Sequence, residues 1–202
     1  SMTCPSRIFP LLTFVVALAM MSAGGDASDA AIDATVEART QATVEARLKT
    51  TLLTRSLLTA IDAGKIDSVG EILDAGIDPN ENPVPEGFPL AGAYPLHLAV
   101  VKGNKEIVQM LLTHGAKIDG RAKNKDEATP LHWAAFFGQK DMATLLIDSG
   151  APINMLDSNH ATPLDADVFV WRLSQDDARK ADHLMEMIEM LKNHGGKPAD
   201  EL

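Results

Sequence analysis

Short apolar stripes recur along this chain at the spacing of helices that bury one face. In residues 129–154, Leu131 and the pair Ala134-Ala135 form one stripe, and Met142, Leu145 and Leu146 form a second. Positions three and four residues apart share a helix face, so each stripe predicts a short amphipathic helix. A glycine follows each stripe, as is typical of a helix end. The pattern predicts a helix–turn–helix unit whose second helix covers about residues 140–149.

The first helix of each predicted unit begins with a shared motif. Thr129-Pro130-Leu131-His132 supplies a capping hydroxyl and then a proline, which suits the first helical position. Variants stand at Tyr94-Pro95-Leu96-His97 and Thr162-Pro163-Leu164-Asp165, with prolines 35 and 33 residues from Pro130. Tyr94 lacks the capping hydroxyl of threonine, which weakens its helix start by about 1 kcal/mol unless a neighbour substitutes. A period in the low thirties predicts a stacked helical repeat.

The motif and its period resemble the ankyrin repeat over about residues 56–196. The resemblance implies an all-α, ankyrin-repeat solenoid of helix–turn–helix repeats with short β-hairpin-like turns, about four repeats plus helical caps. The repeats are expected at residues 56–81, 94–120, 129–154 and 162–197. Leu58 and Asp165 stand where the motif has histidine, and the last repeat is longer by about a dozen residues. Such departures are common in terminal repeats, which face water on one side.

Residues 1–27 have the features of a secretory signal. Arg7 precedes a 14-residue apolar run, Ile8–Met21, and small residues follow, with cleavage expected after Gly25 or Ala27. A bilayer span takes about 20 residues, so an uncleaved membrane anchor is the less favoured alternative. The chain's one cysteine, Cys4, lies inside this segment. A mature chain without disulfides is compatible with the periplasm, so we expect a periplasmic or secreted protein of a Gram-negative bacterium.

Two further segments carry weaker patterns. Residues 28–55 are expected to form an N-terminal helical cap, partly flexible, in front of a repeat domain at 56–202. Residues 81–93 hold three prolines and predict an enlarged turn without regular structure. This turn either contacts a partner or is a tolerated surface insertion, and the sequence leaves both open.

Composition and charge narrow the class of partner. The 202 residues carry a net charge of −10, which argues against nucleic acid because such partners need a basic surface. Acids gather in residues 62–86 and bases in residues 102–125, either as ordinary solvated faces or as charge that steers a partner. We expect one elongated domain, a monomer, with no membrane contact after signal cleavage.

The sequence holds no motif for covalent, phosphate or dinucleotide chemistry, so we expect neither an enzyme nor a cofactor. His97 and His132 belong to the repeated motif, and the resemblance implies that they hydrogen-bond between turns. His114 and His194 precede helix-ending glycines, where a cation is favourable. These four histidines are expected to serve the architecture.

The last predicted helix offers an alternative function. His183–Met190 contains one histidine and three methionines, and soft thioethers suit copper(I). Met187 and Met190 align with core positions of the earlier repeats, which leaves only His183 and Met185 as free ligands. The alternative function is a periplasmic ligand- or metal-binding protein that uses this helix.

The favoured site is aromatic. The resemblance implies that the residues just before the glycine of each first helix face a concave groove where partners bind. In the third repeat these are Phe136 and Phe137, and two adjacent exposed phenylalanines mark an interaction surface. Alternatively, one of the two rings packs beneath the next turn. The predicted partner-binding residues are Val101, Lys102, Trp133, Phe136, Phe137, Phe169 and Val170.

These features predict a periplasmic protein–protein interaction module, either an adaptor or an inhibitor of a protein partner, that binds through the groove. The resemblance also allows a narrower role in support of an exported redox or stress enzyme. Stacked repeats specify a surface rather than a reaction, so the identity of the partner is not encoded in these motifs.

Overall fold

The computed structural model describes residues 27–81 and 83–202. The predicted signal at residues 1–27 lies outside the described residues except for Ala27. The chain divides into two compact units, Ser1–Arg47 and Leu48–Leu202. Helix α2, Ala27–Asp62, contributes to both units. Within the described residues, no helix combines the length and the apolar character that crossing a membrane requires.

The described part of the first unit is the N-terminal portion of α2. Alanine, arginine and glutamate recur there, and all three are strong helix formers. Threonines satisfy their hydroxyls on the helix itself, as where Thr40 Oγ1 donates to the Val36 carbonyl at 2.7 Å. The role of residues 28–55 as a cap stays a prediction.

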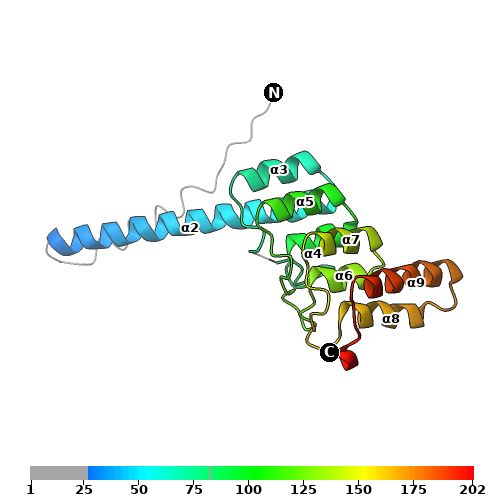
Figure 1. The fold of residues 1–202 in the computed structure, drawn as a ribbon. Coiled ribbons are helices and arrows are strands. Elements are labelled where there is room, and N and C mark those ends of the chain that lie inside the picture. Colours follow the sequence, from blue (N-terminus) through cyan, green and yellow to red (C-terminus); the bar gives the residue numbers. More distant parts are fainter. Residues whose placement is uncertain (1–26, 82) are drawn as a thin grey trace. The chain divides into compact units, whose positions relative to one another are not determined.

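The second unit is built from helix pairs joined by turns (Figure 1). The end of α2 pairs with α3, and Leu57 and Ile61 of α2 are fully buried in the core. The helices that follow are α3 (Ile66–Asp74), α4 (Pro95–Lys102), α5 (Lys105–Thr113), α6 (Pro130–Phe136), α7 (Lys140–Asp148), α8 (Pro163–Leu173), α9 (Ala178–Asn193) and the 3₁₀ turn η1 (Ala199–Glu201). Residues 27–81 and 83–202 contain no strand. The predicted all-α fold is confirmed.

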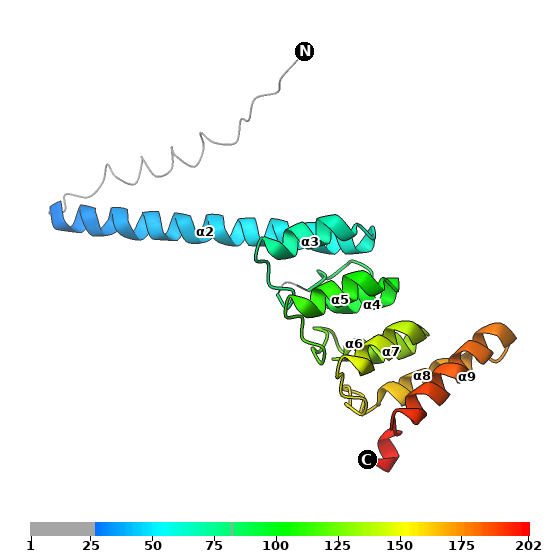
Figure 2. The same cartoon turned by 45° about the horizontal axis from the view of Figure 1, so that its top comes forward.

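The pairs stack in chain order, from α3 to α9 (Figure 2). The first helices α4, α6 and α8 pack in one row, and the second helices α3, α5 and α7 pack in another. One apolar core runs through every pair, from Leu57 in α2 to Leu191 in α9. The small residues Ala99 and Ala134 are fully buried, as the close approach of neighbouring first helices requires.

The first helices begin as the motif predicts, with differences at the cap. The Thr162 hydroxyl accepts from the Asp165 N–H at 3.2 Å, which is the expected cap. Thr129 and His132 form a capping box, in which His132 Nδ1 accepts the Thr129 N–H at 3.3 Å and also contacts the Thr129 hydroxyl at 2.8 Å. Tyr94 makes no side-chain cap, but its backbone N–H donates to His97 Nδ1 at 3.3 Å. The histidine therefore satisfies a backbone donor at the start of the helix.

The motif histidines join each repeat to the turn that follows. His97 Nε2 donates to the Ala128 carbonyl at 3.1 Å, and His132 Nε2 donates to the Ala161 carbonyl at 3.0 Å. Each Nδ1 accepts from a backbone N–H, which leaves the proton on Nε2. Burial lowers the pKa of His97 to about 4 and also lowers the pKa of His132. The predicted structural role of both histidines is confirmed.

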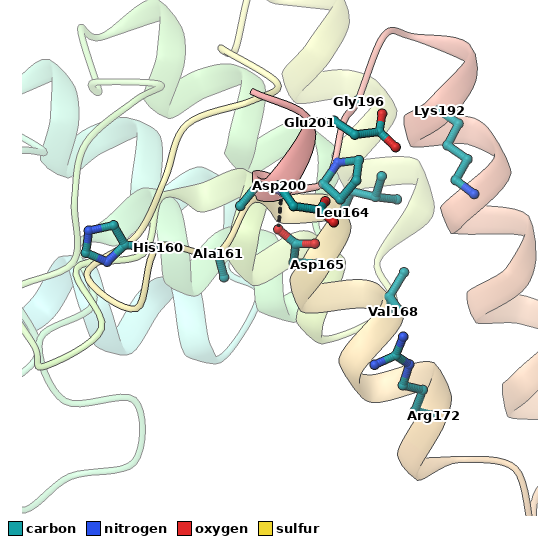
Figure 3. Close-up of a pocket in the computed structure, with 12 residues that line it drawn as sticks. His160, Ala161, Leu164, Asp165, Val168, Arg172, Lys192, Gly196, Asp200 and Glu201 are labelled. Carbon is teal, nitrogen blue, oxygen red and sulfur yellow. Dashed lines mark hydrogen bonds between the residues drawn. The ribbon is translucent and has the colours of Figure 1, made fainter.

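The last repeat reverses this link. Asp165 occupies the histidine position, and its Oδ2 accepts the Ala199 N–H at 2.9 Å, which is the dashed bond in Figure 3. The partner at this link is therefore the backbone N–H of Ala199, where the two preceding links have a backbone carbonyl. A carboxylate accepts where an imidazole N–H would donate, so the change from histidine to aspartate fits the change of partner from a carbonyl to an N–H.

A second set of links follows the second helices. Asn80 Nδ2 donates to the Gly115 carbonyl, and Asn80 Oδ1 accepts the Lys117 N–H at 2.8 Å. Asn154 repeats both bonds, to the Gly195 carbonyl and the Lys197 N–H. Asp119 stands at the position in the intervening turn that is equivalent to Asn80 and Asn154. The residue equivalent to Lys117 and Lys197 in the next turn is Pro152, which has no N–H to donate. The asparagine is therefore present where both of its bonds can form.

Asp167 is an unexpected feature of α8. It aligns with Ala99 and Ala134 of the preceding motifs and is fully buried. In the described part of the chain, neither of its carboxylate oxygens has a hydrogen-bond partner. Burial without a partner favours the neutral acid and raises the pKa of Asp167 to about 7. The last repeat thus holds a titratable group where the others hold a methyl group.

Candidate functional site: an aromatic groove

A groove of about 810 Å³ runs along the ends of α6 and α8 and the turns beside them. Its walls come from the turns before the second and third repeats, which include Leu90 and Asn124, and from the third and fourth repeats, which include Phe136 and Phe169. It is lined by Leu90, Ala91, Asn124, Asp126, Ala128, His132, Trp133, Phe136, Phe137, Asp157, Asn159, Ala161, Asp165, Ala166, Val168, Phe169 and Arg172.

Three phenylalanines are the large apolar side chains of the groove that are well exposed. Phe136, Phe137 and Phe169 are 48%, 43% and 57% exposed. The rings of Phe136 and Phe137 meet edge to face, with centroids 5.3 Å apart. Helix α6 ends at Phe136, and Gly138 follows with a φ of 66°. Neither ring of this pair is buried beneath the next turn, so that alternative is wrong.

Trp133 forms the floor of the groove rather than an exposed anchor. It is only 8% exposed and packs with Ala93, Ala122 and Ala128 in a small core of its own. Its ring lies 6.1 Å from that of Phe137 and 5.2 Å from that of His97. The tryptophan therefore supports the exposed rings and connects them to the histidine link of the preceding repeat.

The structure brings together four of the seven predicted site residues: Trp133, Phe136, Phe137 and Phe169. The other three do not line the groove. Val101 is half-buried against the Trp133 core, and Lys102 forms an ion pair with Asp62 at 2.6 Å. Val170 is only 8% exposed and lies inside helix α8, whereas Phe137 at the equivalent position lies just past the end of α6. Partner binding by any of the seven stays a prediction.

The enlarged turn at residues 81–93 closes one end of the groove through Leu90 and Ala91. Gly92 accepts the Lys123 N–H at 2.8 Å, and a Cβ on Gly92 would lie 2.4 Å from the Lys123 carbonyl oxygen. Only glycine permits this approach between the two turns. Leu90 has a φ of 63°, a left-handed conformation that is rare for a bulky residue. The turn is thus a fixed wall of the groove, a role that its prolines alone do not reveal.

Polar side chains from two neighbouring turns form the rest of the wall. Asp157 Oδ1 accepts from the backbone N–H groups of Asn159 and Ala161 at 2.8 and 2.9 Å. The Asn159 amide donates to Asp126 Oδ1 at 3.3 Å, which ties the two turns together. Sequence reasoning missed these residues, since acids in turns are common and only the stacking places them beside phenylalanines.

A second pocket, of about 600 Å³, lies between α8, α9 and the C-terminal segment. Figure 3 shows Arg172 and Lys192 on its helical sides and the acids Asp200 and Glu201 near η1. It shares Ala161, Asp165, Val168 and Arg172 with the aromatic groove. With cations and carboxylates mixed along its lining, it favours neither an anion nor a cation.

The proposed metal-binding helix is largely occupied by structural contacts. His183 Nε2 lies 2.8 Å from the Gly138 carbonyl of the preceding repeat, and Met187 is fully buried. Met185 is 37% exposed. Across residues 27–81 and 83–202, no three histidine, cysteine or acidic side chains are grouped as they would be to hold a metal ion.

The fold and the groove define a class of protein, a helical repeat scaffold that presents a surface. A family model for ankyrin repeats in three copies matches residues 56–157, and the chain belongs to the ankyrin repeat family. The match covers the first three helix pairs, whereas the fourth is established by its packing on α6. A comparison with curated proteins found no match. Ankyrin repeat proteins are typically non-enzymatic interaction modules.

Proposed function

We propose that this chain is an exported adaptor or regulator that binds a protein partner in the aromatic groove. The observation that carries the proposal is the convergence of three exposed phenylalanines on one groove beside a buried tryptophan. Soluble chains rarely leave such surface in contact with water unless it is covered in a complex.

The expected energetics favour a few anchors. An aromatic side chain buries roughly 150–250 Å² when it is covered, and aromatic residues dominate the binding energy of many interfaces. Phe137 packs against Trp133 and Phe136 packs against Phe137, and these contacts reduce the side-chain entropy that binding would cost. Truncating an anchor of this kind typically costs more than about 1 kcal/mol of binding free energy.

Affinity capture from a periplasmic extract, followed by mass spectrometry, tests the groove. The bait is the mature chain, and the variant is Phe136→Ala with Phe137→Ala. Phe88→Ala is the matched control, because Phe88 is 59% exposed but does not line the groove. We expect the double variant to lose a partner that the wild type and the control both retain, with helical content and melting temperature unchanged. Equal capture by all three proteins would reject the groove.

The periplasmic location is part of the proposal and rests on the apolar run at residues 8–21. Fractionation of cells that express the full chain, with N-terminal sequencing of the product, tests it. We expect a periplasmic product that begins at Asp26 or Ser28. A membrane-bound product that retains the run would establish an uncleaved anchor instead.

A further inference from the structure

The groove combines its apolar floor with an excess of negative charge. Three of its lining residues are aspartates, Asp126, Asp157 and Asp165, and Arg172 is the one lysine or arginine among them. Lys123 and Lys125 lie on the same turn as Asp126, but neither lines the groove. A partner that enters the groove therefore meets carboxylates and aromatic rings together.

The charge of these aspartates is held in place but not neutralised. Within residues 27–81 and 83–202, none of the three forms an ion pair. Asp157 and Asp165 accept hydrogen bonds from backbone N–H groups, which fix the direction of their carboxylates. Asp126 is exposed at the tip of its turn, and its Oδ1 accepts only the weak Asn159 bond at 3.3 Å. The groove can accept a cation without first breaking an internal salt bridge.

We propose that the occupant of the groove is a protein segment that places a bulky apolar side chain within a few residues of lysine or arginine. This inference rests on the proposed function. The apolar side chain packs on Phe136, Phe137 and Phe169, and the cation pairs with the carboxylates of the neighbouring turns. Apolar segments with acidic neighbours are repelled, so the aspartates select among partners that the rings alone would accept.

Selection from a random library of 12-residue peptides tests this specificity without knowledge of the natural partner. The mature wild-type chain is the target, and the Phe136→Ala/Phe137→Ala variant is screened in parallel. We expect the peptides that require both phenylalanines to carry an aromatic or leucine residue within three positions of lysine or arginine. Their frequency of basic residues should exceed that of the unselected library at least about threefold.

The outcomes distinguish the preference for a basic segment from the proposed function, which is binding of a protein partner in the aromatic groove. Peptides that need the phenylalanines but are neutral or acidic would overturn the basic partner and leave the groove intact. Peptides that bind the double variant equally well, or no enrichment at all, would reject both. Self-association of the chain that the double variant loses would identify a second copy as the occupant and overturn the basic segment.

A charge variant tests the carboxylates directly with the best selected peptide. Asp126→Asn keeps an acceptor oxygen and removes one negative charge. Asp148→Asn is the control, because Asp148 is an exposed carboxylate in α7 that does not line the groove. In 50 mM NaCl we expect Kd to rise about fivefold for Asp126→Asn and less than about twofold for the control, with the difference shrinking in 500 mM NaCl. Equal changes in both variants would overturn the role of the groove aspartates.

Discussion

The middle repeats, residues 94–154, and the last repeat, residues 162–197, share a helix start but differ at two positions of the first helix. The middle repeats carry histidines that donate to the next turn and alanines that fill the core. The last repeat carries Asp165, which accepts from the C-terminal segment, and Asp167, which is buried without a hydrogen-bond partner. The last repeat thus holds two acids at positions where the middle repeats hold histidine and alanine.

The largest expected effect on stability comes from Asp167→Ala, which gives the last repeat the alanine of the middle repeats. The pKa of Asp167 is about 7 in the folded chain against about 3.8 in the unfolded chain, so the unfolded state releases its proton first. Stability therefore falls as pH rises from about 4 to about 7, and the full cost is present above pH 7. We expect the variant to raise the free energy of unfolding by about 2–4 kcal/mol at pH 8 and by less at pH 5. Urea unfolding at both pH values measures this.

Two further variants sharpen that result. Asp167→Asn keeps the size of the side chain and should abolish the part of the pH dependence that Asp167 contributes, while a buried amide without partners remains. Ala134→Asp places the same acid in a middle repeat, where α6 is packed between α4 and α8. It should unfold the middle repeats or cost more than the natural aspartate does. A neutral effect of Ala134→Asp would show that the two repeats do not differ in this respect.

The next largest effect is acid sensitivity of the middle repeats. Burial lowers the pKa of His97 from 6.5 to about 4, so the unfolded state binds a proton that the folded state does not. Stability is full above pH 6.5 and is lost as pH falls toward 4, by about 3 kcal/mol for this residue. His132 acts in the same direction. Urea unfolding between pH 4 and pH 7 measures this loss. It is best done in the Asp167→Ala variant, because Asp167 changes the free energy of unfolding with pH in the opposite direction.

The two tryptophans report the two regions separately. Trp133 lies in a middle repeat and Trp171 in the last one, so Trp171→Phe and Trp133→Phe each leave one fluorescent probe. Acid should first change the Trp133 signal, and base should first change the Trp171 signal. Coincident transitions at both ends of the pH range would mean that the stack unfolds as one cooperative body.

A smaller effect is expected at the end of the stack. Asp165→Ala removes the acceptor of the Ala199 N–H and of the Thr162 N–H. Hydrogen bonds of this kind contribute about 1 kcal/mol each, and more when the acceptor is charged. We expect faster hydrogen exchange at Ala199 and little change at Ala128 or Ala161. Equal loss of protection in the middle repeats would contradict a local role.

The smallest effect is expected at an exposed ion pair. Lys102 and Asp62 lie 2.6 Å apart, but both side chains are well exposed to solvent. Pairs of this kind contribute about 0–1 kcal/mol. Lys102→Ala should therefore leave urea unfolding almost unchanged and should not affect peptide capture. A loss of capture would return Lys102 to the binding surface, as the sequence predicts.

The parts predictable from sequence are those that repeat. The helix starts at Pro95, Pro130 and Pro163 follow from a local motif, because each needs only residues a few positions apart. The links of His97 and His132 and the groove position of Phe136 and Phe137 follow from the ankyrin resemblance that this motif carries. Leu90, Asp126 and Asp157 could not be found, since they reach the groove only through the packing of turns from different repeats. The prediction for Val170 is wrong, because α8 continues past this position whereas α6 ends before the equivalent Phe137.

The hydrogen bonds of His97 and His132 both point toward the C-terminus, and Asp165 ends the series by accepting one. The number of repeats in such a chain can therefore change at some places and not at others. If a copy of residues 129–161 were inserted before Thr162, each His132 could still donate to the Ala161 carbonyl at the end of its own copy. In a copy added after the last repeat, the carbonyl of the new turn would lie opposite the Asp165 carboxylate, which has no proton to donate. Adding a repeat there therefore requires Asp165→His first.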